Sequence, residues 1–166
     1  ADGAIVRGES AITERGHVRE IFLDPPTIQA HPDAIRAILQ ADLVICGPGS
    51  LMTSVLPNLL VEGIRRAIEV SPALKVYVCN VATQHGETDA FNVSDHYDAL
   101  REHLKGTSPF DFVLANSNTE AVLPEEWHSE PVRIDRMNIE GARVVKADVV
   151  AEENRYRHDS KKLADA

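Results

Sequence analysis

Short apolar runs alternate with segments of helical periodicity along the 166 residues of the chain. Three runs of strand length contain few polar residues, as is typical of strands buried on both faces of a parallel sheet. These predicted strands lie at about 42–46, 75–79 and 111–115. Apolar spacing also predicts a helix opened by Pro32, a main helix from about Leu60 to Val70, and a helix capped by Ser94. This alternation implies right-handed parallel crossovers, so we predict an α/β fold with three layers around a doubly wound, mainly parallel, Rossmann-like sheet.

The two ends of the chain carry weaker patterns. Residues 4–7 and 18–23 have β-type sequences separated by a polar stretch, and they predict a β-hairpin excursion before the sheet. Beyond Pro124 we expect two further strands and a terminal helix. These three segments are 132–134, 143–150 and 159–164. The length suits one domain with a real core, so we expect residues 1–166 to form a single α/β domain.

The central predicted strand leads into a glycine loop that can hold phosphate. Gly47 and Gly49 allow a tight turn and have no side chain to block an approaching ligand. Ser50, Thr53 and Ser54 then place hydroxyls at the start of a helix, where free N–H groups and the helix dipole favour an anion. The same pattern also suits a helix cap that binds nothing, because such loops recur in α/β folds.

Polar loops follow all three predicted strands, at 47–54, 80–88 and 116–119. The carboxyl ends of parallel strands share one edge of a sheet, and open α/β sheets bind their ligands there. We therefore predict a pocket rich in amides and hydroxyls, suited to a nucleotide or a sugar phosphate.

The second of these loops offers several polar groups. Asn80 either holds a ligand or ties two loops together, and His85 is either a general base or a solvated side chain. Gly86 suggests a turn with positive φ. Glu87 and Thr88 could reach a sugar hydroxyl or a bound magnesium ion. The pattern indicates a binding site more clearly than a reaction.

Charge and composition restrict the partners. The chain has 17 Lys and Arg against 26 Asp and Glu, and this net charge of −9 argues against a nucleic-acid partner. Because no apolar run approaches the roughly 18 residues of a membrane span, we expect no membrane partner and a cytoplasmic location. Cys46 and Cys79 each close an apolar run, which is typical of buried free thiols in a reducing compartment. No Cys/His spacing resembles a structural zinc site, so we predict no metal site.

Several motifs resemble those of the CofD/YvcK-like family of 2-phospho-lactate transferase-like proteins. The stretch 41–54 with 57–61 resembles the first family signature, and 80–88 with 95–96 resembles the second. The remaining matches follow the family's order at 2–3, 8–10, 158–159 and 162–163. Family members are roughly twice as long and begin with a strand and a Gly-Gly-Gly-Thr-Gly loop, which this chain lacks. The chain also has no initiator methionine, so we expect it to be a piece of a longer protein, the C-terminal half.

The family has two branches, and the resemblance is greater to the branch of gluconeogenesis factors. That branch implies a UDP-sugar-binding regulator of carbon metabolism and cell-envelope morphogenesis. The alternative is a magnesium-dependent phospho-ester transferase of the 2-phospho-lactate type. We favour binding without catalysis, because no base or metal-binding carboxylate is close in sequence to the loop at 47–54. A third interpretation is an α/β domain that serves only as an oligomer interface, and a homo-oligomer is compatible with the first two.

The loops and the resemblance together give a set of candidate ligand- and phosphate-binding residues. They are Gly47, Pro48, Gly49, Ser50, Thr53, Ser54, Asn58, Asn80, Thr83, Gln84, Gly86, Glu87, Thr88 and Asn116. No catalytic residue is assigned. The expected ligand is a nucleotide-sugar or another phosphorylated small molecule, and magnesium is expected as a cofactor only for the transferase.

Overall fold

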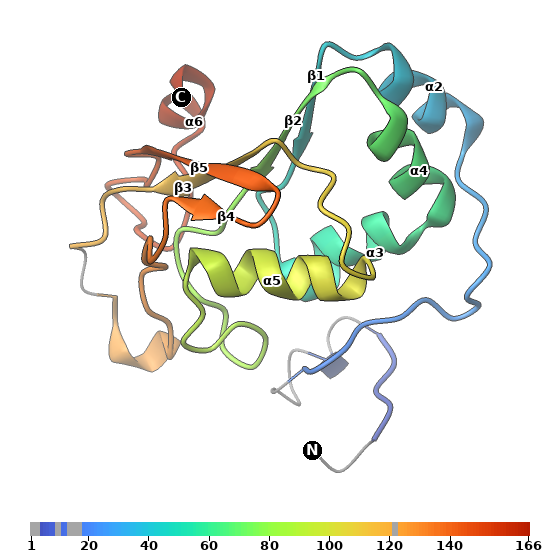
Figure 1. Cartoon of the computed structure of the whole chain (residues 1–166). Helices are drawn as coiled ribbons and strands as arrows, with labels where there is room; N and C mark the ends of the chain where they lie inside the picture. Colours follow the sequence, from blue (N-terminus) through green and yellow to red (C-terminus); the bar gives the residue numbers. More distant parts are fainter. Residues whose placement is uncertain (1–3, 9–10, 13–17, 121–122) are drawn as a thin grey trace.

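A computed structural model describes residues 4–8, 11–12, 18–120 and 123–166, and a five-stranded sheet lies at its centre (Figure 1). The strands are β1 (Leu43–Cys46), β2 (Leu74–Val78), β3 (Phe112–Asn116), β4 (Asn138–Ile139) and β5 (Ala142–Ala147). Their order across the sheet is β1-β2-β3-β5-β4. β1, β2, β3 and β5 run parallel to one another, and β4 is antiparallel to β5. The three strands predicted from the apolar runs, and their parallel arrangement, are confirmed.

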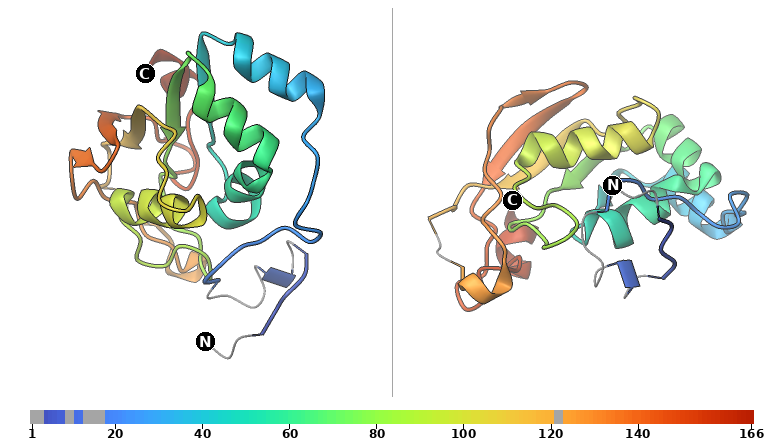
Figure 2. Two further views of the ribbon diagram at one scale, coloured as in Figure 1. Left: turned by 45° about the vertical axis from the view of Figure 1, so that its right-hand side comes forward. Right: turned by 90° about the horizontal axis from the view of Figure 1, so that it is seen from below.

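Most helices cover one face of this sheet (Figures 1 and 2). The helices are α2 (Pro32–Gln40), the π-helix η1 (Leu51–Val55), α3 (Leu56–Leu60), α4 (Glu62–Val70), α5 (Val93–His103), the 3₁₀-helix η2 (Glu125–Trp127) and α6 (Ser160–Asp165). Pro57 is the second residue of α3, which directly follows η1, and a new helix begins at Glu62. None of the helices in the described ranges is long and apolar enough to cross a membrane.

The core lies between the helices and one face of the sheet. Strand side chains alternate between faces, and Tyr77 and Val113 point into this layer with no exposed surface. The ring of Tyr77 lies 6.4 Å from that of Tyr97 on α5 and 6.0 Å from that of Phe110. This packing holds α5 against the face of the sheet formed by β2 and β3.

The second face of the sheet is covered by far fewer of the described elements. The described elements on it are α6 and the chain that leads into it, and Leu163 of α6 packs in a smaller cluster with Val81, Val149 and Val150. The predicted mainly parallel α/β fold is confirmed, and α6 is the part of the third layer that the described residues supply. Ile45 on this second face is 57% exposed.

The expected N-terminal hairpin is not found. The described residues 4–7 and 18–23 form no strand, and part of the polar stretch between them lies outside the described residues. The Val18 N–H instead donates to the carbonyl of Gly86 (2.9 Å), and the Ile21 N–H donates to Nε2 of His103 (3.0 Å). These backbone groups bond to a loop and a helix side chain, so the segment forms a strap and not a strand pair.

Three smaller expectations also differ. The segment 132–134 forms no strand, and the pairing beside it is limited to an isolated antiparallel bridge between Ala82 and Pro131, in which the Val132 N–H donates to the carbonyl of Val81 (3.0 Å). The strand predicted at 143–150 is the shorter β5 (Ala142–Ala147). The N-cap of α5 is Asn92 in a capping box with Asp95, and the Ser94 hydroxyl donates to Asp135.

Candidate functional site

The loop after β1 turns tightly against the end of β2. Gly47 has φ +92°, and a Cβ at this position would lie 2.9 Å from the carbonyl oxygen of Val78. Both the backbone angle and the close approach therefore demand glycine. Gly49 has neither constraint, since a Cβ there would lie 3.4 Å from the Cβ of Ser54. Of the two glycines in this loop, Gly47 is the one that its geometry requires.

The Ser50 side chain begins η1 and links two loops. Its Oγ accepts the Thr53 N–H (3.1 Å) and the Thr53 hydroxyl (2.6 Å), and it donates to Oε2 of Glu87. The Thr53 hydroxyl also lies 3.4 Å from Oε1 of Glu87, whose side chain is buried. The first and second polar loops thus meet, and they meet through a carboxylate.

This contact corrects one sequence argument. Binding is favoured over transfer in the sequence because no carboxylate follows the glycine loop closely along the chain. The structure brings Glu87, 37 residues after Ser50, into hydrogen-bond contact with its hydroxyl. A carboxylate therefore does lie beside the candidate phosphate loop, and sequence distance was the wrong criterion.

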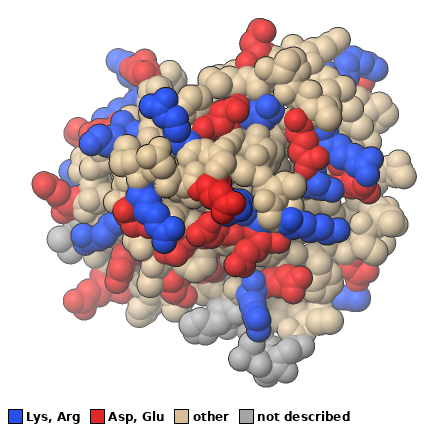
Figure 3. Space-filling model, in the orientation of Figure 1, with Lys and Arg blue, Asp and Glu red and all other residues tan. Residues whose placement is uncertain are grey.

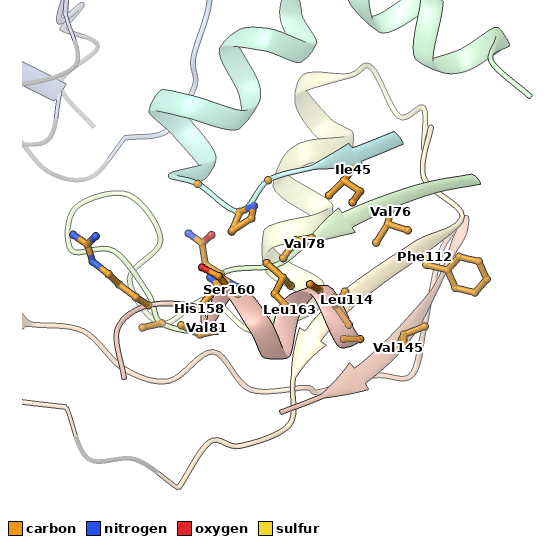
Figure 4. Close-up of a pocket in the computed structure, with 18 of the residues that line it drawn as sticks. Ile45, Val76, Val78, Val81, Phe112, Leu114, Val145, His158, Ser160 and Leu163 are labelled. Carbon is orange, nitrogen blue, oxygen red and sulfur yellow. The ribbon is translucent and has the colours of Figure 1, made fainter. Parts of the chain in front are cut away.

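A cavity of about 1170 Å³ extends from this loop along the second face of the sheet (Figure 4). Its polar end is lined by Gly47, Pro48, Gly49, Ser50, Asn80, Gln84, Tyr156, Arg157, His158 and Ser160. A second cavity of about 390 Å³ adjoins it and shares Gln84, Tyr156 and Arg157. The second cavity adds Glu87 and the indole of Trp127, which meets the Tyr156 ring edge-on at 5.8 Å. The two cavities together offer room for a phosphate group and for a flat ring.

The C-terminal segment supplies side chains that sequence reasoning did not select. His158 donates from Nε2 to the carbonyl of Cys79 (3.1 Å), and burial lowers the pKa of its imidazole, which favours the neutral form. Arg157 precedes it and lies at the rim of both cavities. Asp159 accepts the N–H groups of Lys161 and Lys162 and caps α6, which corresponds to the terminal helix predicted at 159–164. In the sequence, the only indication that this segment belongs to the site was the match of 158–159 to the family motifs.

Several predicted site residues lie outside both cavity linings. They are Thr53, Ser54, Asn58, Thr83, Gly86, Thr88 and Asn116. The Thr83 hydroxyl accepts the Glu130 N–H (2.9 Å), and the Thr88 hydroxyl accepts the Gln84 N–H (2.9 Å). Oδ1 of Asn116 accepts the Val149 N–H (3.2 Å). These contacts shape the loops that carry the site, and direct ligand contact by these residues remains a prediction.

Two further features of the second loop follow from its fold. Gly86 has φ +81°, so the predicted positive-φ turn is confirmed. His85 is paired with a carboxylate, since its Nδ1 lies 3.0 Å from Oδ1 of Asp89. Asn80 donates to the side-chain oxygen of Gln84 (3.2 Å), which links the start of the loop to its middle at the cavity wall.

The residues of the site could hold a metal ion only if a bound ligand supplied further oxygen atoms to it. No group of three or more His, Cys, Asp or Glu side chains within the described ranges could hold a metal ion. Glu87 beside the hydroxyls of Ser50 and Thr53 offers one carboxylate, and Mg²⁺ commonly combines one carboxylate with substrate phosphates and water. These residues fit one side of a magnesium–nucleotide site.

Charged groups of both signs are mixed on one face of the molecule. On the face shown in Figure 3, Lys and Arg side chains alternate with Asp and Glu. Many form pairs along helices, such as Arg65 with Glu69 (2.8 Å) and Arg66 with Glu62 (2.7 Å). Attraction of an anion to the site therefore depends on local donors such as Arg157 and the start of η1.

Both cysteines are free thiols, as expected; Cys79 is fully buried and Cys46 partly exposed. Burial raises the pKa of Cys46 to about 12 and raises that of Cys79 as well. Because the thiolate is the reactive species, we expect alkylation of native Cys46 to accelerate about tenfold per pH unit from pH 7 to 10, without a plateau. Iodoacetamide labelling followed by mass spectrometry measures this rate. A plateau near pH 9 would contradict the raised pKa.

Known proteins are similar to this chain in sequence and in fold. A family model described as 2-phospho-L-lactate transferase CofD matches residues 1–150. A Listeria innocua protein named gluconeogenesis factor is 40% identical over 170 residues, which cover 99% of this chain and 52% of that protein. A Bacillus subtilis protein of the same name is 41% identical over 174 residues, covering 98% and 54%.

The crystal structure of a Bacillus halodurans protein matches this fold with a TM-score of 0.88 at 38% identity. The match covers 99% of this chain and 55% of that one. The chain therefore spans about half the length of the curated relatives it matches, and it corresponds to their C-terminal half.

Proposed function

Because this chain belongs to the CofD family, whose model matches its residues 1–150, we propose that it carries the phosphate-facing side of a nucleotide-sugar site. The relatives named gluconeogenesis factor support a regulatory role for that site in carbon metabolism. The proposed ligand is a UDP-sugar. The proposed regulatory role includes cell-envelope morphogenesis as well as carbon metabolism. No membrane or nucleic-acid partner is proposed.

The cavity at the ends of β1 and β2 is the observation that carries this proposal. Ligands of open α/β sheets lie outside the carboxyl ends of the strands, and the polar end of this cavity lies there, while the rest of it runs along the second face of the sheet. Gly47 turns the backbone so that Ser50 starts a helix at the cavity wall. The Ser50 hydroxyl accepts the Thr53 N–H, and the other N–H groups of a first helical turn lack intrahelical partners. Arg157 adds a cation at the same wall. Backbone donors, a hydroxyl and a guanidinium together suit a diphosphate.

The remaining wall suits a sugar and a base. Asn80 and Gln84 carry amide groups, which can exchange hydrogen bonds with sugar hydroxyls or with a base edge. Trp127 and Tyr156 line the adjoining cavity, and the indole is 42% exposed. A flat ring could therefore stack on the indole without displacing core side chains.

One observation favours a second candidate function, phospho-ester transfer. Glu87 touches the hydroxyls of the phosphate loop, and such a carboxylate could hold Mg²⁺ against a diphosphate. When bound, the ion would neutralise developing charge on the phosphate oxygens. Glu87 and Ser50 would hold it, while Arg157 would orient the phosphates. The family model's description as a transferase agrees with this candidate.

Replacing Arg157 by glutamine tests the binding site. We expect UDP-sugar affinity of the full-length protein to fall roughly 10- to 100-fold, because a charge-assisted hydrogen bond to phosphate is lost. Titration calorimetry with a panel of UDP-sugars measures the affinity. The matched control is Arg66→Gln on α4, whose side chain is 70% exposed and paired with Glu62. Equal affinities of Arg157→Gln and wild type for UDP-sugars would show that Arg157 does not contact the ligand.

Turnover separates the two candidate functions. The full-length protein is incubated with magnesium and a UDP-sugar, and separately with activated phospholactate and a deazaflavin acceptor. Saturable UDP-sugar binding without product supports the regulator. Acceptor-dependent release of nucleoside monophosphate would establish the transferase in its place, and absence of both binding and product would overturn both candidates.

A further inference from the structure

The C-terminal segment folds back on itself and holds the ring of His158 at the polar end of the larger cavity (Figure 4). The Ala151 N–H donates to the carbonyl of Arg157 (2.9 Å), and the Asp159 N–H donates to the carbonyl of Val149 (2.8 Å). These two bonds fix the backbone on both sides of His158. The ring is therefore held in place in the absence of a ligand.

One hydrogen bond decides which ring nitrogen of His158 carries the hydrogen. Nε2 lies 3.1 Å from the carbonyl oxygen of Cys79, and a carbonyl oxygen can only accept, so Nε2 is the donor. Burial lowers the pKa of the imidazole, which favours the neutral ring near neutral pH. A neutral ring with its hydrogen on Nε2 has a bare lone pair on Nδ1.

This lone pair on Nδ1 is available to a ligand. No residue in the described ranges donates a hydrogen bond to it. The His158 side chain is only partly buried, and Nδ1 is not one of the described side-chain atoms that are buried without a partner. Because His158 lines the cavity, Nδ1 is the ring nitrogen that a bound molecule can reach.

The charged groups around the ring leave it neutral. The titratable side chains on the surrounding elements are those of Cys79, Tyr156, Arg157, Asp159, Lys161 and Lys162. Asp159 accepts two backbone N–H groups at the start of α6, and Lys162 pairs with Asp148 (3.1 Å). Burial raises the pKa of the Cys79 thiol, which is therefore uncharged. The pKa of His158 is lowered by burial and raised by the Cys79 carbonyl, with burial the larger effect.

A bare acceptor discriminates among the groups of a nucleotide-sugar. The diphosphate presents only acceptor oxygens, which the Nδ1 lone pair would repel. The donors of such a ligand are the hydroxyls of its sugar rings and the N–H of its base. The base is proposed to stack on Trp127 in the adjoining cavity, whose lining does not include His158. Sugar hydroxyls are therefore the donors that suit Nδ1.

We propose that Nδ1 of His158 accepts a hydrogen bond from a sugar hydroxyl of the bound nucleotide-sugar. His158 is then a specificity residue, because a ligand without that hydroxyl leaves the acceptor unpaired. Arg157 and the start of η1 hold the phosphates at the same end of the cavity. This inference rests on the proposed function, since it requires a nucleotide-sugar in the cavity.

Two amide substitutions separate the roles of the two ring nitrogens. The amide nitrogen of Gln takes the place of Nε2, so His158→Gln keeps a donor to the Cys79 carbonyl and loses the acceptor. The amide oxygen of Asn takes the place of Nδ1, so His158→Asn keeps the acceptor and loses the bond to Cys79. We expect His158→Gln to keep the wild-type thermal midpoint and to lower the affinity for UDP-glucose about 3- to 10-fold. His158→Asn should show the reverse, a lower midpoint with an affinity within about twofold of wild type. Titration calorimetry of the full-length protein at about pH 8 measures the affinities.

The pH dependence of binding is a second readout. The ordinary pKa of histidine is 6.5 and that of His158 is lowered, so wild-type affinity for UDP-glucose should be constant above that pH and fall below it. Protonation converts Nδ1 from an acceptor into a donor, which the hydroxyl meets less well. His158→Gln should lack this fall. The control is His31→Gln at the start of α2, where the side chain is 74% exposed, and it should keep the wild-type affinity and pH profile.

Two shortened ligands identify the hydroxyl. UDP lacks the hexose, and 2′,3′-dideoxyuridine diphosphate also lacks both ribose hydroxyls. If the hexose supplies the donor, the loss of affinity in His158→Gln disappears with UDP. If the ribose supplies it, the loss persists with UDP and disappears with the dideoxy compound. A loss that persists with all three ligands would overturn the proposal, because the last of them has no sugar hydroxyl.

The other outcomes are equally decisive. Equal affinities of His158→Gln and wild type for UDP-glucose would show that Nδ1 contacts no ligand group. Affinities that follow the thermal midpoints of the two variants would make His158 a structural residue only. An affinity that rises on acidification would mean that a protonated ring meets the phosphates. A wild-type protein that binds none of the ligands would overturn the proposed function and this inference together, whereas the other failures leave the proposed function standing.

Discussion

Gly47→Ala is expected to lower the free energy of unfolding by about 3 kcal/mol, the largest effect of any single change in the candidate site. Two costs combine at this position. The backbone angle φ is +92°, where an L side chain is strained, and the new Cβ would lie 2.9 Å from the carbonyl oxygen of Val78. The loop must move away from β2 to relieve the contact. Urea unfolding of wild type and variant measures the change.

Two other glycines separate these costs. Gly106 has φ +82°, and a Cβ added there would meet nothing within 4 Å, so Gly106→Ala reports the backbone strain alone, about 1 kcal/mol. Gly49→Ala has neither a positive φ nor a close backbone contact, and we expect a change below about 1 kcal/mol. If Gly47→Ala were no more destabilising than Gly106→Ala, the close approach to the Val78 carbonyl would contribute nothing to the loss in free energy of unfolding.

Glu87→Ala is expected to lower the free energy of unfolding by about 2 kcal/mol. Hydrogen bonds to a charged acceptor contribute about 1.5–3 kcal/mol, and the Glu87 carboxylate accepts from Ser50 while Thr53 lies within reach. The Ser50 and Thr53 hydroxyls retain their contact with each other, which limits the loss. Thermal and urea unfolding of the variant measure the effect.

A double-mutant cycle identifies the partner of Glu87. Combining Glu87→Ala with Ser50→Ala should give a coupling energy of about 1–2 kcal/mol, because the two residues are in contact. The control is Glu62→Ala on α4, a surface pair with Arg66 in which the carboxylate is 64% exposed, and its cost should stay below about 0.5 kcal/mol. Additive effects of the Glu87 and Ser50 substitutions would show that the loops are held together by other contacts.

The strands of the sheet were predictable because their signal is local. Val76 and its neighbours form an unbroken apolar run, and such a run stands out in a sequence window of a few residues. The strap near Ile21 was misjudged for the opposite reason. Its residues are of a type common in β-strands, but its backbone N–H groups donate to the side chain of His103 and to the carbonyl of Gly86. No local sequence pattern reveals such distant partners. The Ser94 prediction failed because Asn92, two residues earlier, is an equally good cap.

The glycine loop of the candidate site was also visible in the sequence. A strand followed by Gly47 and by Ser50 at a helix start is a local pattern, and the structure has that geometry. The remaining cavity wall was not visible. Arg157 and Tyr156 reach the site only because the C-terminal segment returns across the second face of the sheet, more than 100 residues after Gly47. Contacts between such distant segments depend on the complete packing of the chain.

The sequence by itself determined the parallel α/β class, the order of the central strands along the chain and the glycine turn after β1, because each depends on neighbouring residues. The tertiary structure alone decided that Glu87 lies against Ser50, that Arg157 joins the cavity, and that one face of the sheet is left open at Ile45. Apolar strands such as β1 look the same in sequence whether one face or two are covered. Only the placement of the helices in the described ranges shows which face they cover and which they leave open.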